Sequence, residues 1–469
     1  MIQVPPNTGL LLFPSLDPDS REGRGHGQTV EGLNRNAPLG LFYLAAIAQR
    51  AGVSCDVIDQ RIEPFDADEL AQIVATQRPP WLGFYLCDYE VPRGKVIRMI
   101  RAVRAKSDAP IICGGPPYDP RPLLEAGANA VALGEGERTF ESWLAGVAGG
   151  LRVEQIPGVA YLRDGEVRRT APAPLVANLD ELPFPIRKYP GRYVITGNPM
   201  IRMPCYELVT NRGCVLHCAF CSSHRFWGRF RVRSVDNVID ETMMLRERYG
   251  ARYLHFRDDI FAPSRAWLDE WVAKHTTIGT RLPYSIYLHP DSHRRDVEYA
   301  IGALARSGCN MICYGLQSVD PDVLRAIDRD PDEPARLAEH LAACKKYGVM
   351  SLVSVIFGLP RDDGAATEAT GAWLRKHRPT IMLALPLQKL YGSPIAERYP
   401  GDTPVGKFSA AQLDELIHRI TRRYYLTGWH LPRLAWQVLW RNPRWFLYVL
   451  PRLRHGLDYF QFTRRRKNW

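Results

Sequence analysis

The segment TNRGCVLHCAFCSSH, residues 210–224, places three of the chain's ten cysteines in one short stretch. Three residues separate Cys214 from Cys218, and two separate Cys218 from Cys221. A closed structural zinc site is usually built from paired C-x-x-C units, and the chain has no second such unit. Three thiolates on a [4Fe–4S] cluster leave one iron open to an exogenous ligand, which suits a reactive centre. The segment therefore predicts a reactive iron–sulfur site, with a zinc loop on an unrelated α/β protein as the alternative.

The cysteine segment follows the first of six apolar runs in residues 201–400. These runs are predicted strands, and a helical pattern follows each of the first five. The runs are YELVTNRG (206–213), YLHFRDD (253–259), YSIYLHP (284–290), MICYGLQS (311–318), SLVSVIFGLP (351–360) and TIMLALPLQ (380–388). Six such units predict a partial parallel (β/α)6 barrel that is open on one side, with its chemistry on the loops after the strands.

Residues 1–150 alternate continuously apolar strands with helical patterns, which predicts a doubly wound parallel sheet. Ligands of such sheets bind at the carboxyl ends of the strands. Those ends carry Leu86-Cys87-Asp88, Gly114-Gly115-Pro116-Pro117 and Gly134-Glu135-Gly136-Glu137.

The predicted domains are 1–150, a proline-rich linker at 151–200 with a hairpin turn at Asp164-Gly165, 201–400, and a helical tail at 401–469. The formal charge of +11 lies in the tail, where residues 417–469 carry twelve Lys or Arg against one acid, Asp458. Five of the eleven tryptophans also lie there. The tail is interpreted either as a solvated helical face or as a surface for an anionic partner, lipid headgroup or phosphorylated substrate.

Ten cysteines in 469 residues do not form a disulfide scaffold. The amino terminus has no basic stretch before its short apolar run, and no run of ~20 apolar residues is present. A cytoplasmic protein is expected, and no nucleic-acid partner.

The cysteine spacing Cys214-x3-Cys218-x2-Cys221 resembles the motif of the radical SAM superfamily. The resemblance implies that S-adenosylmethionine (SAM) chelates the open iron and is cleaved to a 5′-deoxyadenosyl radical. Four further segments resemble the family's strand ends: FRDDIF (256–261), YGLQS (314–318), IFGLP (356–360) and YGSPI (391–395). By this resemblance the SAM-binding residues are Phe220, Asp258, Gln317, Ser318 and Gly358.

The first domain resembles the Rossmann-like cobalamin-binding domain found in one branch of that superfamily. The resemblance rests on NAPLGLFYLAAIAQRAG (36–52), ICGGPPYDP (112–120) and VALGEGE (131–137). It implies cobalamin contacts from Pro38, Leu39, Gly40, Leu86, Cys87, Asp88, Gly114, Gly115, Pro116, Gly134, Glu135 and Gly136. The D-x-H-x-x-G box is absent, so His26 is not assigned as a cobalt ligand, and cobalt without a protein ligand is expected. The alternative is a domain that keeps this fold but no longer binds cobalamin.

The two resemblances together imply an enzyme in which one SAM methylates cob(I)alamin and a second yields the radical that activates the substrate carbon. C-methylation of a small-molecule or lipid intermediate is the leading hypothesis, with flavodoxin or ferredoxin as the electron donor. The alternatives are a rearrangement, cyclisation or heteroatom insertion, a methylthiotransferase-like reaction, and a non-enzymatic corrinoid-binding protein. Candidate substrate-facing residues follow the third strand of the barrel: Tyr287, His289 and Asp291.

Cysteines other than Cys214, Cys218 and Cys221 matter for the methylthiotransferase alternative, which would use them for a second cluster. Cys55 and Cys113 lie within apolar runs and are interpreted as buried small hydrophobes, whereas Cys87 ends a predicted strand. Cys309 and Cys313 are interpreted as core residues, with auxiliary cluster ligands as the alternative.

Overall fold

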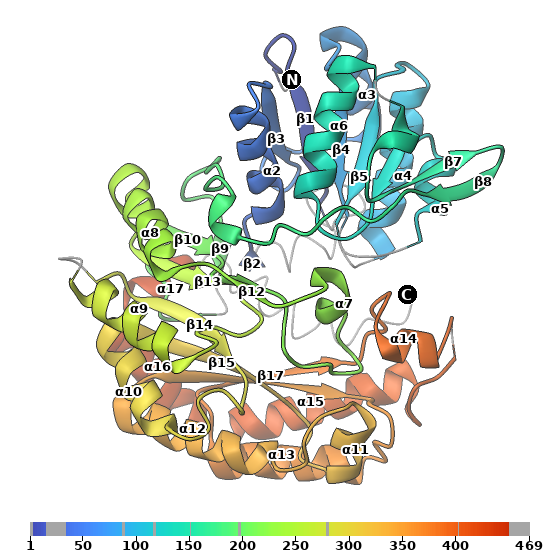
Figure 1. Ribbon diagram of the computed structural model, residues 1–469. Helices are drawn as coiled ribbons and strands as arrows, with labels where there is room; N and C mark the ends of the chain where they lie inside the picture. Colours follow the sequence, from blue (N-terminus) through green and yellow to red (C-terminus); the bar gives the residue numbers. More distant parts are fainter. Residues whose placement is uncertain are drawn as a thin grey trace. The chain divides into compact units, whose positions relative to one another are not determined.

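The computed structural model describes residues 3–15, 34–86, 90–115, 119–150, 152–195, 198–277, 281–401 and 403–449. The chain forms two compact units, residues 1–192 with 226–228 and residues 193–225 with 229–469. Each unit contains its own parallel sheet (Figure 1). The domain bounds inferred from the sequence stay predictions.

The first unit is built on a seven-stranded sheet. Its order is β3-β1-β4-β5-β6-β7-β8, and the first five of these strands are parallel. They are β1 (Gly9–Phe13), β3 (Cys55–Asp59), β4 (Leu82–Tyr85), β5 (Ile111–Gly114) and β6 (Ala130–Ala132). The hairpin β7 (Val159–Arg163) and β8 (Glu166–Arg169), which turns at Asp164 and Gly165, extends this sheet antiparallel to β6. The predicted doubly wound sheet is confirmed.

Helices cover both faces of the first sheet. Helix α2 (Leu39–Arg50) packs against α6 (Glu137–Gly149), whereas α3 (Ala67–Gln77) packs against α4 (Glu90–Arg104), which also contacts α5 (Arg121–Glu125). The chain passes from β1 to β3, which lies on one side of β1, and then to β4, which lies on the other side of β1. This switch in direction opens a crevice at the carboxyl ends of β1 and β4, which is the usual ligand site of such sheets. The short elements of this unit are β2 (Asn34–Arg35), η1 (Val153–Gln155) and η2 (Leu179–Glu181).

The second unit is built on a six-stranded parallel sheet whose spatial order follows the sequence. The strands are β10 (Cys205–Leu208), β13 (Tyr253–Phe256), β14 (Tyr284–Leu288), β15 (Cys309–Gln317), β16 (Met350–Phe357) and β17 (Ile381–Pro386). Because β10 and β17 are the two edges of this sheet, the barrel is open, as predicted.

Helices follow the strands of the second unit in turn. They are α8 (Val235–Tyr249), α9 (Arg265–Thr277), α10 (Val297–Ser307), α11 (Pro321–Ala326), α12 (Glu333–Tyr347) and α13 (Ala365–His377). After β17 come α14 (Pro394–Arg398), α15 (Ala410–Leu426), α16 (His430–Arg441) and α17 (Arg444–Val449). Helix α15 packs on β17 and α13, and α16 packs on α15. The remaining short elements are β9 (Val194–Ile195), β11 (Asn211–Arg212), α7 (Ser223–Trp227) and β12 (Arg231–Val232).

An aromatic cluster fixes helix α9 on the sheet of the second unit. Phe256 and Tyr284 meet the ring of Trp271 edge-on, and Trp271 donates a hydrogen bond to the Tyr284 hydroxyl at 3.1 Å. Such aromatic pairs add about 0.5–1.5 kcal/mol beyond the area that they bury. No helix in the described ranges has the length and apolar composition needed to cross a membrane.

Candidate functional site

The cysteine loop follows β10 and is held at its centre by backbone hydrogen bonds. The Ala219 N–H donates to the carbonyl of Ile327 at 3.0 Å, and the Ile395 N–H donates to the carbonyl of Ala219 at 2.9 Å. These bonds tie the loop to the end of α11 and the start of α14. Phe220, the next residue, packs against the apolar cluster around Ala219 and Ile395. The loop therefore has a fixed path between Cys218 and Cys221.

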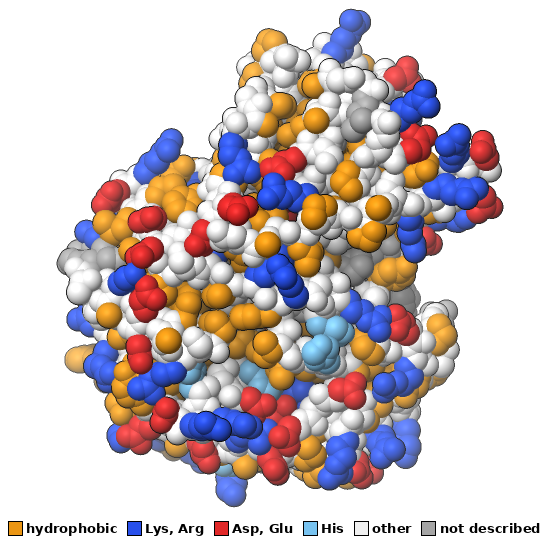
Figure 2. Space-filling view, in the orientation of Figure 1, with side chains coloured by type: hydrophobic (Ala, Val, Ile, Leu, Met, Phe, Trp, Pro, Cys, Tyr) orange, Lys and Arg blue, Asp and Glu red, His pale blue; other side chains and the backbone are white. Residues whose placement is uncertain are grey.

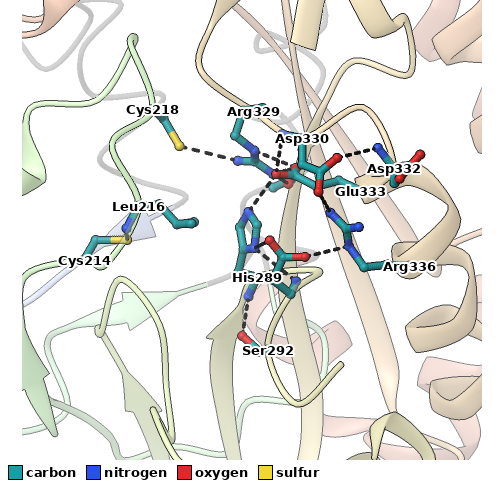
Figure 3. A network of polar contacts seen from close by, with 12 residues as sticks. Cys214, Leu216, Cys218, His289, Ser292, Arg329, Asp330, Asp332, Glu333 and Arg336 are labelled. Atoms are coloured by element: carbon teal, nitrogen blue, oxygen red, sulfur yellow. Dashed lines mark hydrogen bonds and ion pairs between the residues drawn. The ribbon is translucent and has the colours of Figure 1, made fainter. Parts of the chain in front are cut away.

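Each of the three thiols has a hydrogen-bond donor beside it. The Sγ of Cys214 accepts from the Leu216 N–H at 3.5 Å, and the Sγ of Cys221 accepts from the Ser223 N–H at 3.4 Å. The Sγ of Cys218 lies 3.8 Å from Nη1 of Arg329 (Figure 3). Donors directed at sulfur favour the thiolate, which is the form that binds metal. The three predicted ligands thus share one loop with chemistry suited to a cluster.

Burial opposes ionisation of these thiols in the protein by itself. It raises the pKa of Cys214 and of Cys221 to about 11. Burial also raises the pKa of Cys218, although Arg329 counteracts it. Three thiolates, one buried and two half-buried, therefore require added positive charge, which the irons of a cluster supply. The donor set fits a [4Fe–4S] cluster.

Arg329 links the cysteine loop to a buried ion-pair network. Its Nε donates to the Glu333 carboxylate at 2.6 Å, and its Nη2 donates to the carbonyl of Gly315 at 2.8 Å. Burial raises the pKa of Glu333, but hydrogen bonds from His289 and Arg329 outweigh burial, so the net pKa is lowered. Glu333 therefore stays ionised and holds the guanidinium beside Cys218.

His289 extends the same network (Figure 3), and Asp291 joins it through Arg336. The Nδ1 of His289 accepts the Asp291 N–H at 3.1 Å, so the ring proton of a neutral His289 lies on Nε2. That Nε2 lies 3.5 Å from the Glu333 carboxylate. The Asp291 carboxylate pairs with Nε of Arg336 at 2.6 Å. The predicted substrate-facing residues His289 and Asp291 are thus brought together.

His289, Asp291 and Glu333 also place ligand atoms within 4.8 Å of one another, as a metal site would. Here, however, each carboxylate already has a cationic partner. Arg329 pairs with Glu333, and Arg336 pairs with Asp291. The two guanidinium groups supply the charge that a metal ion would otherwise bring, so the cluster is an ion-pair network.

Asp258 is an anchor for the strand that leads into the cysteine loop. Its buried carboxylate accepts from the Thr210 N–H at 2.6 Å, the Thr210 hydroxyl at 2.8 Å and the Asn211 N–H at 3.1 Å. Burial raises the pKa of Asp258 to about 7, while these hydrogen bonds favour the ionised form. The adjacent Asp259 accepts a hydrogen bond from the Ser223 hydroxyl and lies close enough to Cys214 and Cys221 to raise their pKa.

Two strand ends provide groups suited to a nucleoside ligand. Gln317 has a φ of 65°, at an irregularity in the pairing of β15 with β16. Its buried Oε1 has no hydrogen-bond partner among the described residues, and Ser318 beside it is also buried. Gly358 has a φ of 80° and donates its N–H to Asp362 at 3.3 Å. A non-glycine residue held at positive φ and an orphaned acceptor both fit a ligand-binding edge. The SAM contacts assigned from the sequence stay predictions.

Tyr287 is placed in a different environment from His289. Its ring meets His255 edge-on at 5.8 Å, and it packs beside the cluster that includes Met200 and Tyr253. Burial raises the pKa of Tyr287 to about 12, so the phenol stays protonated. Its assignment as a substrate contact stays a prediction.

In the first unit, glycines shape the described part of the predicted cobalamin edge. Gly115 follows β5 with a φ of 140°, and a Cβ there would lie 2.3 Å from the carbonyl oxygen of Leu86. The absence of a side chain at Gly115 lets the ends of β4 and β5 approach each other closely. The other described residues of the set are Pro38, Leu39 and Gly40 at the start of α2, Gly114 at the end of β5, and Gly134, Glu135 and Gly136 after β6. Cys87, Asp88 and Pro116, like His26 and residues 450–469, lie outside the described residues.

The cysteines at 55, 113, 309 and 313 are strand residues. Cys55 lies in β3 and Cys113 in β5, and two strands separate them in the sheet. Three strand spacings amount to ~14 Å, so these thiols cannot share one cluster. Burial raises the pKa of both thiols. Cys309 and Cys313 are buried in β15, as the core interpretation predicts.

Sequence reasoning missed Arg329 and Glu333. They lie four residues apart in the segment RDPDEP (329–334), a spacing at which opposite charges pair at a helix start. That signal was present in the sequence, but it does not reveal that the guanidinium reaches Cys218.

Comparison with known proteins bears on both units. Residues 208–374 match the radical SAM superfamily, and residues 29–144 match the B12 binding domain. The chain is 27% identical to the uncharacterized methyltransferase PH0819 of Pyrococcus horikoshii, over 83% of this chain and 88% of that protein. It is 25% identical to cytidylyl-2-hydroxyethylphosphonate methyltransferase of Streptomyces wedmorensis, over 71% of each chain.

Two solved structures share the fold over most of the chain. The methyltransferase TsrM from Kitasatospora setae, with cobalamin and a [4Fe–4S] cluster bound, has a TM-score of 0.67 and 20% identity, covering 85% of this chain and 76% of its own. The cobalamin-dependent enzyme OxsB, with aqua-cobalamin and SAM bound, has a TM-score of 0.71 and 13% identity, covering 97% of this chain and 72% of its own.

Proposed function

Because the chain belongs to the radical SAM superfamily and carries a B12-binding domain, we propose that it C-methylates an unactivated carbon of a small-molecule or lipid biosynthetic intermediate. Its cofactors are a [4Fe–4S] cluster, SAM and cobalamin. When bound, the cluster and SAM supply a 5′-deoxyadenosyl radical and cobalamin supplies the methyl group. The polypeptide binds and orients these groups and excludes water from them.

The observation that carries the proposal is the loop of three thiols on the sheet edge where barrel chemistry occurs. Cys214, Cys218 and Cys221 each have a donor directed at sulfur. Three thiolates leave one iron of the cluster free for SAM. The orphaned oxygen of Gln317 and the turn at Gly358 follow β15 and β16 at the same edge of the parallel sheet.

The names of several relatives favour methyl transfer over other radical reactions. Two that align over most of this chain are methyltransferases, as stated above. The hopanoid C-3 methylase of Methylococcus capsulatus is 31% identical over 45% of this chain and 41% of its own. The two of these names that include a substrate, the cytidylyl-2-hydroxyethylphosphonate methyltransferase and the hopanoid methylase, name different ones, so the relatives support the reaction class and leave the substrate open.

A second candidate function is a radical cyclisation without methyl transfer. The anaerobic magnesium-protoporphyrin IX monomethyl ester cyclase of Rubrivivax gelatinosus is 23% identical over 82% of this chain and 73% of its own. A methylthiotransferase-like reaction has less support, because the separation of Cys55 from Cys113 excludes a second cluster that uses both.

The electron donor that we propose is a small redox protein such as flavodoxin or ferredoxin. A reduced cluster is required before SAM can be cleaved, and the two matched regions of the chain correspond to a radical SAM domain and a B12-binding domain. A peripheral contact with a membrane or an anionic substrate through the carboxyl-terminal region is also proposed, and is developed below.

A substrate-independent assay separates these functions. The anaerobically reconstituted protein is incubated with hydroxocobalamin, a strong reductant and SAM carrying a trideuterated methyl group. A methyltransferase forms trideuterated methylcobalamin and S-adenosylhomocysteine, and also releases 5′-deoxyadenosine. A cyclase-like protein releases 5′-deoxyadenosine without labelled methylcobalamin, which would overturn the methylation proposal. The Cys218→Ala variant is the control, because it keeps the first unit intact.

A further inference from the structure

A pocket of ≈ 580 Å³ in the second unit is surrounded by arginines. It lies at the amino-terminal edge of the sheet, because its walls include residues just before β10, β13 and β14. The turn after α16 forms another wall. The basic residues that line it are Arg202, Arg246, Arg252, Arg281, Arg441 and Arg444, and no acidic residue is among the described residues that line it.

These arginines carry charge that the described residues do not neutralise. Arg441 donates to the carbonyl of Gly348 at 2.8 Å, and Arg281 donates to the carbonyl of Arg306. Backbone carbonyls leave the positive charge uncompensated, and no ion pair with a carboxylate joins any of the six in the described ranges. On the face drawn in Figure 2, by contrast, basic and acidic side chains are interspersed. Six like charges around one pocket repel one another, so an anionic ligand stabilises the arrangement.

The helix that ends at this pocket exposes a row of tryptophans. Trp436 and Trp440 are 65% and 79% exposed, their rings stack at 6.3 Å, and Trp429 at the helix start is 79% exposed. Leu434 and Val438, on the other side of α16, pack on the sheet. Helical spacing therefore directs the tryptophans away from the body of the unit. Exposed apolar surface of this size marks an interaction site.

Trp436 and Trp440 on α16 and the arginine pocket are held together by the end of this helix. Trp440 directly precedes Arg441, and Asn442 follows. The Asn442 amide donates to the carbonyls of Pro199 at 3.0 Å and Ile201 at 2.7 Å. Ile201 itself lines the pocket. An incoming surface that covers the tryptophans therefore also meets the arginines.

One kind of partner satisfies both features. Tryptophan rings partition to the headgroup region of a bilayer, and guanidinium groups bind phosphate through paired hydrogen bonds. An amphipathic helix with an aromatic face beside basic residues lies in the plane of such an interface. A soluble phosphate ligand would explain the arginines but not the tryptophans. A symmetric pairing of two copies through this patch would oppose arginine to arginine.

We propose that α16 and the arginine pocket form a docking surface for an anionic phospholipid bilayer. The pocket takes lipid phosphate groups, and Trp436 and Trp440 enter the headgroup layer. The contact is peripheral. The cysteine loop follows β10 at its carboxyl end, so the docking surface lies at the opposite edge of the same parallel sheet. Docking therefore leaves the cysteine loop uncovered, and it does not depend on which reaction the enzyme performs.

Vesicle flotation of the full-length, cluster-loaded protein tests the proposal. The probes are vesicles of phosphatidylcholine alone and of phosphatidylcholine mixed with phosphatidylglycerol. The protein should float with the anionic vesicles at low salt, with a blue shift of tryptophan fluorescence, and the bound fraction should fall as salt rises. Replacing Arg441→Ser and Arg444→Ser together should weaken binding about 25-fold, at roughly fivefold for each arginine. Replacing Trp436→Ser and Trp440→Ser should weaken it about tenfold.

A matched control comes from α15, where Arg419 and Arg423 both pair with Glu368. Replacing these two with serine removes the same charge and should leave vesicle binding unchanged within twofold. The proposal fails if the protein floats with neither vesicle, or if the control pair and the pocket pair lose binding equally. It also fails if inorganic pyrophosphate binds tightly while vesicles do not, or if light scattering shows a dimer that the tryptophan variant abolishes.

Discussion

The guanidinium of Arg329 lies 3.8 Å from the sulfur of Cys218, across 111 residues of sequence. It is buried, and Glu333 holds it in place from four residues along the chain. A fixed positive charge therefore stands beside one ligand of the proposed cluster. Such a charge stabilises the more negative, reduced state of the cluster, so Arg329 bears on the potential at which the enzyme accepts its electron.

Replacing Arg329→Met together with Glu333→Gln should make the cluster harder to reduce. The paired change avoids leaving an unpaired buried charge, which alone would destabilise the protein by about 3–5 kcal/mol. Arg329 affects Cys218 more strongly than Glu333 does, so removing both leaves a net loss of about 1 kcal/mol, which corresponds to ~40 mV for a one-electron couple. Redox titration followed by electron paramagnetic resonance measures this shift. The control is Arg336→Met on α12, which removes a charge paired with Asp291. It should change the potential by less than a third of the shift expected for the double variant.

Asp258→Asn should loosen the cysteine loop. An asparagine oxygen can still accept from the N–H groups of Thr210 and Asn211, but the asparagine amide would face the Thr210 hydroxyl, which donates to the second carboxylate oxygen in the native protein. Loss of this charge-assisted hydrogen bond should cost about 1–3 kcal/mol. The melting temperature and the iron content after reconstitution should both fall. Asp240→Asn, on the exposed side of α8, should change neither. Equal behaviour of the two variants would contradict the anchoring role of Asp258.

Gly115→Ala should impair the first unit. The added Cβ would lie 2.3 Å from the carbonyl oxygen of Leu86, at a φ of 140° that side chains rarely adopt. The strain should cost about 1–3 kcal/mol and displace the strand end at the predicted cobalamin edge. Less corrinoid should co-purify, as measured by its visible absorbance. Gly149→Ala, where no neighbouring atom lies within 4 Å of the added Cβ, should retain full loading.

Buried histidines should make the second unit sensitive to acid. Burial lowers the pKa of His275 to about 4, from its ordinary 6.5, and its ring stacks on Trp271. The folded state binds this proton more weakly than the unfolded state, so its contribution to stability is complete above pH 6.5 and is lost as the pH falls towards 4. His275→Phe should therefore reduce the loss of unfolding free energy between pH 7 and pH 5 by about 2 kcal/mol. Urea unfolding followed by tryptophan fluorescence measures the free energy of unfolding at each pH. An equal loss of stability between pH 7 and pH 5 in both proteins would contradict the role given to His275.

The strands of both sheets could be predicted because parallel strands are buried on both faces and therefore appear as continuous apolar runs. Each predicted run of the barrel overlaps a strand, from Cys205–Leu208 to Ile381–Pro386. The cysteine loop could be predicted because its ligands are close in sequence. The hairpin at Asp164-Gly165 was also visible in the sequence, but its pairing with β6 was not, because turn chemistry says nothing about the third strand.

Contacts between distant segments could not be predicted. The approach of Arg329 to Cys218 requires the loop after β10 to meet the turn before α12, and only the folded sheet brings these two segments together. Likewise, the pair Asp258-Asp259 could be assigned to the correct strand end from the sequence. Which of the two carboxylates anchors the backbone and which contacts the cysteine loop could not be predicted. The Asp258 carboxylate accepts hydrogen bonds from Thr210 and Asn211, whereas the Asp259 carboxylate accepts one from Ser223 in the cysteine loop.

The most direct test of the account is the metal content and SAM cleavage of anaerobically reconstituted protein. The account predicts a [4Fe–4S] cluster, and release of 5′-deoxyadenosine when a strong reductant is added with SAM. Both should be lost in Cys214→Ala, Cys218→Ala and Cys221→Ala. Protein that holds zinc or no metal at this loop, and that releases no 5′-deoxyadenosine under reductant, would contradict it.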